Sequence, residues 1–282
     1  MSKFIHFILY IPLYTLSLLP IKILYYISDI LYIFVYYIFR YRREISLNNL
    51  KKSFPEKSSQ EINKIHKKFY QHFCDLIIES IKSISANNNF FKNRIKFKNL
   101  EKINNYDSFI VAVSHYGNWE WGLLSISLSF NKNIIGLFQE LNNNFFNNII
   151  KKSRERFGAK LLDINNLLKY INVNQNFVIG IIGDQSPQKH KSNLWISFLN
   201  QQTLFHQGTE KISKKYNLPI YFCDMQKIKR GYYNISIEIL CENTKETENS
   251  EITSVYLQRI EKQIKKNPEF WLWTHNRWKH QK

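Results

Sequence analysis

The sequence has few cysteines and lacks several familiar catalytic signatures. Its three cysteines, Cys74, Cys223 and Cys241, form no CxxC pair, which excludes a zinc knuckle or thioredoxin-like site and fits a reducing compartment. No GxSxG elbow, HExxH helix, GxGxxG turn or GxxxxGK[ST] loop is present. These absences argue against a serine hydrolase, a zinc site and nucleotide binding, and we expect no metal.

Acidic residues are also scarce. The 282 residues include 40 Lys and Arg but 22 Asp and Glu, so the formal net charge is +18. Such an excess favours anionic partners: nucleic acid, lipid headgroups or acidic carrier proteins. A composition biased toward Lys, Asn, Ile, Tyr and Phe is an alternative cause of the charge. A hydrophobic fraction of 44% and an aromatic fraction of 16% indicate a folded chain with a real core.

Formal charge is nearly absent near the N-terminus. Between residues 4 and 39 only Lys22 and Asp29 are charged, and Pro20 divides the segment into two apolar stretches. A membrane span needs about 20 apolar residues, so each stretch is marginal. We predict a membrane anchor over residues 1–43, either a tilted span with an interfacial helix or a shallow hairpin. Its basic end at residues 40–43 fits a cytoplasmic flank. A hairpin buried in a soluble protein is the alternative.

The rest of the chain, residues 44–282, is predicted to be the functional domain. Residues 44–94 have mostly helical periodicity, and Ser58 or Ser59 is predicted to cap a helix that begins near Glu61. The polar tract at 86–93 and the charged tract at 242–251 are predicted to be connections.

From residue 95 onward, short apolar runs alternate with helical segments. Strands are predicted at 109–113, 133–138, 160–162, 177–182, 220–223 and 233–240. Helices are predicted at 119–130, 145–157, 164–170, 207–216 and 252–265. This alternation predicts an α/β fold with a mixed sheet flanked by helices.

The sharpest local feature is His115 followed by Glu120 in the run HYGNWEWG. The strand predicted at 109–113 ends just before His115, and α/β sheets place their sites beyond strand ends. Gly117 permits a sharp turn, and Asn118 is predicted to cap a helix whose first turn holds Glu120. We expect Glu120 to face His115, orient the imidazole and make it a general base. A chance pairing is the alternative.

Two other clusters are candidates. Asp184 and Gln185 follow the strand predicted at 177–182 and should reach the sheet edge that holds His115, unless they form an ordinary capped turn. Arg154 or Arg156 has a guanidinium suited to a phosphate or a developing oxyanion, although either residue alone is equally suited to the solvated surface.

Together these pieces resemble the lysophospholipid acyltransferase superfamily, and within it the lipid A biosynthesis acyltransferases, which add late acyl chains to bacterial lipopolysaccharide. The resemblance covers nearly the whole chain. Its motifs after the anchor are Asn48-Asn49-Leu50, Ser53-Phe54-Pro55-Glu56, His115–Glu120, Arg154–Gly158, Gly183-Asp184-Gln185, Phe205–Gly208 and Trp271–Trp278. The chain departs from the family at Phe198-Leu199-Asn200, where a bulky-bulky-Gly triplet is common, and this leaves the acceptor pocket in doubt.

The resemblance implies a glycerolipid acyltransferase-like fold in which His115 takes a proton from an acceptor hydroxyl while Glu120 holds His115. Alanine at either position is then predicted to nearly abolish transfer. Five other residues would shape the phosphate-binding and oxyanion region: Arg154, Gly117, Asn118, Asp184 and Gln185. The implied donor is a thioester of acyl carrier protein, a co-substrate, so no cofactor is expected. The implied acceptor is a lipid A precursor among the membrane lipids at the cytoplasmic face of the cell inner membrane.

Two other functions stay open. The acceptor can be another lipid, such as a lysophospholipid or an aminolipid. A basic, membrane-associated binding protein without catalysis is the other alternative, but no RNP-like, helix-turn-helix or zinc-finger pattern is present, so nucleic acid is not expected. The aromatic-basic run Trp271–Trp278 is predicted either to meet the membrane interface or a lipid, or simply to pack as a C-terminal segment.

Overall fold

The apolar runs become the strands of a large sheet in the computed structural model, which describes residues 3–103, 106–140, 143–280 and 282. The strands of this sheet are β1 (Ile95–Lys98), β2 (Phe109–Val113), β3 (Asn133–Leu137), β4 (Lys160–Leu162), β5 (Phe177–Ile182), β8 (Ile220–Lys229) and β9 (Tyr232–Cys241). Across the described residues they pair in the order β1-β9-β8-β2-β5-β3-β4. Only the β8–β9 pair is antiparallel within this sheet, so the sheet is mixed.

The predicted mixed α/β fold is therefore confirmed, with two additions. β1 has the sequence IKFK, in which lysines interrupt the apolar pattern, and for this reason it was not predicted. A separate hairpin of β6 (Leu194–Phe198) and β7 (Gln201–Phe205) was missed as well. Its turn contains Leu199 and Asn200, both with positive φ. The atypical triplet thus forms a hairpin turn, and Asn tolerates the left-handed conformation that glycine otherwise favours.

Helices occupy the segments between these strands. They are α3 (Arg43–Ser53), α4 (Ser59–Lys82), α5 (Asn88–Arg94), α6 (Trp119–Ser129), α7 (Asn144–Glu155), α8 (Ile164–Val173), α9 (Gly208–Tyr216) and α10 (Glu251–Lys266). As predicted, α4 is capped by Ser58, in a capping box with Glu61. The tract at 86–93, predicted to be a connection, is instead mostly α5, because the side chain of Asn87 caps a short helix there.

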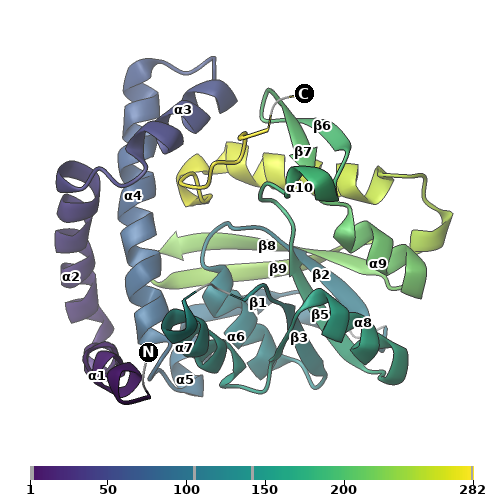
Figure 1. Ribbon diagram of the computed structural model, residues 1–282, viewed down its shortest axis with the longest axis horizontal. Helices are drawn as coiled ribbons and strands as arrows, with labels where there is room; N and C mark the ends of the chain where they lie inside the picture. Colours follow the sequence, from purple (N-terminus) through teal and green to yellow (C-terminus); the bar gives the residue numbers. More distant parts are fainter. Residues whose placement is uncertain (1–2, 104–105, 141–142, 281) are drawn as a thin grey trace.

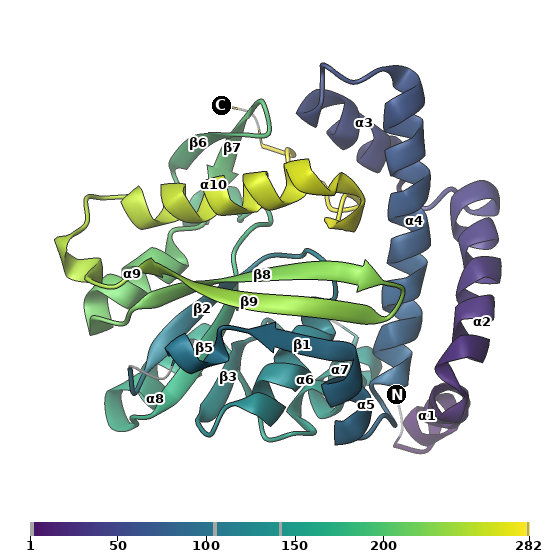
Figure 2. The same ribbon diagram turned by 180° about the vertical axis from the view of Figure 1, so that it is seen from behind.

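Alternating side chains of β2 separate the two halves of the core. Ile110 and Ala112 face a cluster that includes residues of α8, α9 and α10, whereas Phe109 and Val111 face a cluster formed with α5 and α6. This period of two is what a strand buried on both faces requires. Figures 1 and 2 show the result, with α9 and α10 on one side of the sheet and α5 and α6 on the other.

The N-terminal helices stand outside this core. α1 (Lys3–Leu18) and α2 (Ile21–Ile33), which continues as a π-helical turn at Phe34–Ile38, lie beyond α4 as seen from the sheet (Figure 1). Within the described residues, one helical segment, Ile21–Ile38, is long and apolar enough to cross a membrane, and 22% of it is buried. Side chains such as Tyr26 and Ile30 are exposed. This exposure disagrees with the alternative in which the segment is buried inside the protein.

A buried histidine in α4 makes the fold sensitive to acid. His66 is buried, and the hydroxyl of Ser46 lies 2.8 Å from its Nε2. Burial, together with the charge of Arg43, lowers the pKa of His66 to about 4 from its ordinary 6.5. Because the unfolded chain binds this proton at higher pH than the folded chain does, stability should decline as the pH falls from about 6.5 through about 4. Denaturant unfolding measured across this range should show a smaller decline for His66→Gln; an equal decline would contradict the assignment.

Candidate active site

The register of two neighbouring strands brings His115 and Asp184 together. Val113 pairs with Ile182 at the ends of β2 and β5, and each candidate lies two residues beyond its strand. Asp184 Oδ1 lies 2.6 Å from His115 Nδ1, and Asp184 Oδ2 accepts a hydrogen bond from the His115 backbone N–H at 3.0 Å. The expectation that Asp184 reaches the same sheet edge as His115 is thus met. With Nδ1 directed at a carboxylate, Nε2 is the ring nitrogen that can take a proton.

Glu120 has a different partner from the one predicted. Its carboxylate accepts two hydrogen bonds from Arg154, from Nε at 2.7 Å and from Nη2 at 2.5 Å, and one from Trp119 Nε1 at 3.2 Å. The carboxylate that contacts the imidazole is that of Asp184, so the expected His115–Glu120 contact is corrected. The physical reason is direction: Glu120 lies in the first turn of α6 and faces α7, whose last turn supplies Arg154.

Opposite charge sets the ionisation of both carboxylates. Burial alone would raise the pKa of Asp184, but the attraction of His115 and hydrogen bonds from His115 and Trp271 hold that pKa below its ordinary value. Burial likewise opposes ionisation of Glu120, and Arg154 outweighs it, so the pKa of Glu120 is also lowered. Both groups are therefore anionic at neutral pH, and each carboxylate has its own partner: His115 for Asp184 and Arg154 for Glu120.

The loop between β2 and α6 is turned toward the protein interior. The backbone N–H of Gly117 donates to Phe270 O at 2.9 Å, and that of Asn118 donates to Met225 Sδ at 2.9 Å. These two amides are thereby occupied, which argues against the oxyanion role expected for Gly117 and Asn118. The predicted turn and cap are confirmed: Gly117 has φ +65°, and the Asn118 side chain accepts from Trp121 N. A Cβ at Gly117 would lie 2.9 Å from Met225.

The structure separates the two candidate arginines. Arg154 lies in the site through its pair with Glu120, whereas Arg156 is exposed and donates from Nη1 to Ser83 O at 2.6 Å. Gln185 is half-buried next to Asp184. Across the described residues, no group of three or more His, Cys, Asp or Glu side chains is arranged to hold a metal ion.

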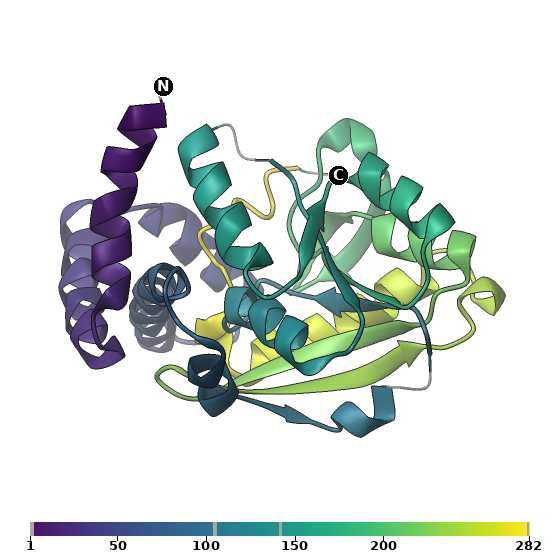
Figure 3. The same ribbon diagram turned by 90° about the horizontal axis from the view of Figure 1, so that it is seen from below.

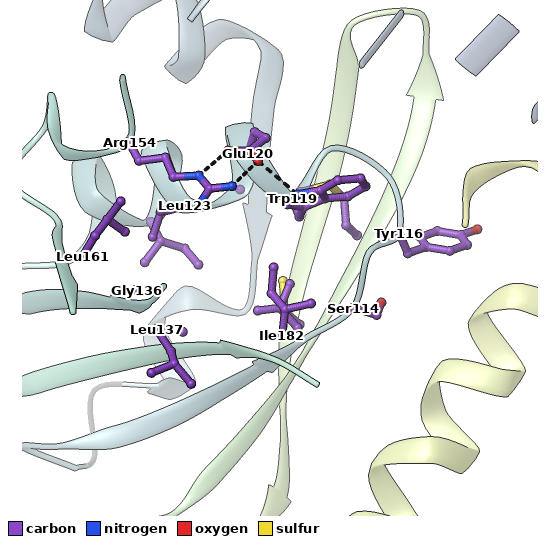
Figure 4. A pocket seen from close by; sticks show the side chains of 16 residues that line it. Ser114, Tyr116, Trp119, Glu120, Leu123, Gly136, Leu137, Arg154, Leu161 and Ile182 are labelled. Carbon is purple, nitrogen blue, oxygen red and sulfur yellow. Dashed lines mark hydrogen bonds and ion pairs between the residues drawn. The ribbon is translucent and has the colours of Figure 1, made fainter. Parts of the chain in front are cut away.

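The Glu120–Arg154 pair stands between two apolar spaces. One is a cavity of about 80 Å³ between α6 and the sheet, and its lining includes Trp119, Leu123 and Ile182 (Figure 4). The other is a groove of about 400 Å³ that α1, α4, α6 and α7 line. Figure 3 shows α1 and α7 next to each other. His115 does not line the cavity, but its ring packs edge-on against Trp119, with the ring centroids 5.0 Å apart. Apolar volume therefore lies beside the Glu120–Arg154 pair, and Trp119, which lines the cavity, also contacts His115.

The C-terminal aromatic run packs against the two residues His115 and Asp184. Trp271 and Trp273 are buried, and Trp271 Nε1 donates to Asp184 Oδ2 at 2.7 Å. The backbone N–H of Leu272 donates to His115 O at 3.0 Å. The prediction that this run meets the membrane or a lipid is wrong for these tryptophans, and the packed-segment alternative is correct. The role of Trp271 in holding Asp184 had no signal in the sequence, since it depends on a contact across 87 residues.

Comparison with known proteins identifies the family of the chain. No match was found among curated proteins. The family model described as "Bacterial lipid A biosynthesis acyltransferase" matches residues 1–280, which is almost the entire chain. Bacterial members of this family are membrane-associated, in keeping with the apolar N-terminal helix. The chain therefore belongs to the bacterial lipid A biosynthesis acyltransferase family and is an acyltransferase.

Proposed function

We propose that the enzyme transfers a fatty acyl chain from a thioester of acyl carrier protein to a hydroxyl of a lipid A precursor, with His115 as the general base. The observation that carries this proposal is the 2.6 Å contact between His115 Nδ1 and the buried carboxylate of Asp184. A carboxylate at Nδ1 selects the tautomer whose Nε2 accepts a proton, and it stabilises the imidazolium that forms. The side chain of His115 is 20% exposed, so the base is open to a substrate.

We propose the following course for the reaction. Nε2 of His115 takes the proton of the acceptor hydroxyl as its oxygen attacks the thioester carbonyl. The tetrahedral intermediate collapses, the carbon–sulfur bond breaks, and the thiolate of the carrier takes the proton back from His115. Arg154 donates to Glu120 from Nε and Nη2. We therefore assign its remaining nitrogen, Nη1, to the developing oxyanion or to a substrate phosphate. Gln185, next to Asp184, is a further candidate contact for the acceptor.

Charge and apolar volume support these substrates. A net charge of +18 favours encounter with an acidic carrier protein and with a phosphorylated lipid. The cavity and the groove beside Glu120 and Arg154 are lined mainly by apolar side chains and suit acyl chains. We also propose that the enzyme works at the cytoplasmic face of the inner membrane. In support, Arg40 is exposed at the end of the apolar segment, although Arg42 and Arg43 donate to Thr274 O and Tyr36 O.

Membrane lipids provide the test of the reaction. Deleting the gene in its bacterial host should give lipid A that lacks one acyl chain, as measured by mass spectrometry of extracted lipids. Wild-type protein should restore the missing chain, and His115→Ala protein at equal abundance should not. Unchanged lipid A, with a change in phospholipids or aminolipids instead, would overturn the proposed acceptor in favour of another lipid.

Extraction from membranes provides the test of location. In roughly 1 M salt the Debye length is about 3 Å, so attraction between basic side chains and headgroups is largely screened. The protein should nevertheless stay with the membrane pellet, because the exposed apolar side chains of Ile21–Ile38 do not depend on charge. Detergent should release it. Complete release by salt, alongside a peripheral marker protein, would show that α2 is not an anchor.

A further inference from the structure

A buried carboxylate on α4 connects three separate parts of the chain. Glu79 is fully buried and accepts hydrogen bonds from three side chains. Its Oε1 accepts from Tyr25 of α2 at 2.7 Å, and its Oε2 accepts from Asn118 Nδ2 at 2.6 Å and from Tyr233 of β9 at 2.8 Å. Burying a carboxylate is costly unless it is well bonded, so these three donors together hold Glu79 in one geometry.

Asn118 links this carboxylate to the loop that carries His115. Its Nδ2 donates to Glu79, and its Oδ1 accepts from the backbone N–H of Trp121 at 2.8 Å as the cap of α6. Trp121 in turn donates from Nε1 to Glu79 O at 3.0 Å. Two turns earlier on α4, His72 Nε2 lies 3.3 Å from Gly117 O. The loop is thus joined to α4 at two points, through Gly117 and through Asn118.

Tyr25 links the same carboxylate to the apolar N-terminal helix. Its hydroxyl reaches past the tip of the β8–β9 hairpin, which Figure 2 shows extending toward α4. At that tip, a Cβ on Gly231 would lie 2.1 Å from the Tyr25 hydroxyl. Gly231 has φ +72°, so both the turn and the tyrosine require glycine here. The position of α2 relative to the sheet is therefore closely defined at Tyr25.

We propose that Glu79 is a positioning residue for acyl transfer, which fixes the loop of His115 to α4 and, through Tyr25, to the apolar helix α2. This inference rests on the proposed function for its kinetic effect. Glu79 does not touch the reacting atoms; it acts through Asn118, three residues after His115. A membrane that holds α2 in place would therefore also define the position of His115, the general base.

Exchanging donor and acceptor between Glu79 and Asn118 tests the proposal. Asn118→Asp keeps the cap of α6, since Asp also accepts from Trp121 N, but it turns a carboxylate oxygen toward Glu79. Glu79→Gln alone should be mild, because its oxygen can accept from Asn118 and Tyr233 while its nitrogen donates to the Tyr25 hydroxyl. In the double variant, which combines Glu79→Gln with Asn118→Asp, the side-chain amide at position 79 can flip and so exchange the places of its oxygen and nitrogen. Its nitrogen then donates to the new carboxylate at position 118 and its oxygen accepts from Tyr25, so the pair is again complementary.

The kinetic readout uses purified full-length protein in detergent, radiolabelled acyl-acyl carrier proteins of several chain lengths and a lipid A precursor. We expect Asn118→Asp to lower kcat per folded molecule by about tenfold or more, with little change in KM, and Glu79→Gln in the same chain to recover most of this loss. If unfolding midpoints shift while kcat per folded molecule stays at the wild-type value in all three variants, the pair is only structural and the proposal is overturned.

A second readout does not depend on the substrate. Hydrogen–deuterium exchange in the peptide spanning residues 115–121 should rise in Asn118→Asp and in Tyr25→Phe. It should fall again in the double variant that combines Asn118→Asp with Glu79→Gln. Ser85→Ala is the matched control: it removes a hydroxyl bonded to Ser17 O at 2.7 Å, which joins the turn after α4 to α1 without reaching Glu79. If hydrogen–deuterium exchange of this peptide is unchanged in both Asn118→Asp and Tyr25→Phe, the proposal is overturned. Wild-type protein that acylates no lipid A precursor would contradict the proposed function alone, and the exchange pattern would still decide the role of Glu79.

Discussion

Replacing His115 with alanine is expected to reduce acyl transfer by about 10²–10⁴-fold, the usual contribution of a general base. The acceptor hydroxyl then has no group that takes its proton as the thioester is attacked. The loss should appear in kcat, in initial rates with purified protein and matched concentrations of donor and acceptor.

The same substitution should leave the fold intact. Asp184 loses the bond to the imidazole but keeps the backbone N–H at position 115 and Trp271 Nε1 as donors, so the buried carboxylate stays bonded. Circular dichroism and the unfolding midpoint should therefore stay close to those of the wild type. His115→Gln is the matched control, since its amide can donate to Asp184 but cannot act as a base. Full activity in a folded His115→Ala variant would refute the mechanism.

Replacing Asp184 with asparagine is expected to have the second largest effect, a decrease in kcat of about 10²–10⁴-fold. The carboxylate faces three N–H groups: the backbone and Nδ1 of His115 and Nε1 of Trp271. An amide has one acceptor oxygen, so either orientation of asparagine sets an NH₂ group against a donor. The imidazole then loses the partner that selects its reactive tautomer.

Glu120→Gln provides the comparison that separates the two carboxylates. It weakens the pair with Arg154 and should lower activity through the placement of that guanidinium, by less than Asp184→Asn does. The pH dependence of kcat adds a second measure, because loss of the carboxylate at Nδ1 should alter the profile of the base more than loss of Glu120. If Glu120→Gln has the larger effect on both, Glu120 orients His115 in the working enzyme, as the spacing in HYGNWE predicts.

Local patterns were sufficient for most elements of the fold. The strand at 109–113, the helix capped by Ser58 and the helix capped by Asn118 follow from apolar periodicity and capping within a few residues. β1 was not predicted because its lysines break the apolar pattern, and α5 was not predicted because its sequence is polar. Elements stabilised mainly by tertiary packing have weak signals of their own.

The sequence alone determined that His115, Asp184 and Glu120 lie at the ends of buried elements, since strand ends and helix caps are encoded by neighbouring residues. Tertiary structure alone decided how they pair. The adjacency of β2 and β5 gave His115 its carboxylate, the packing of α7 beside α6 gave Glu120 its arginine, and the contact of α4 with α2 buried Glu79. These pairings join residues 34–69 positions apart, and no local pattern specifies which distant elements become neighbours.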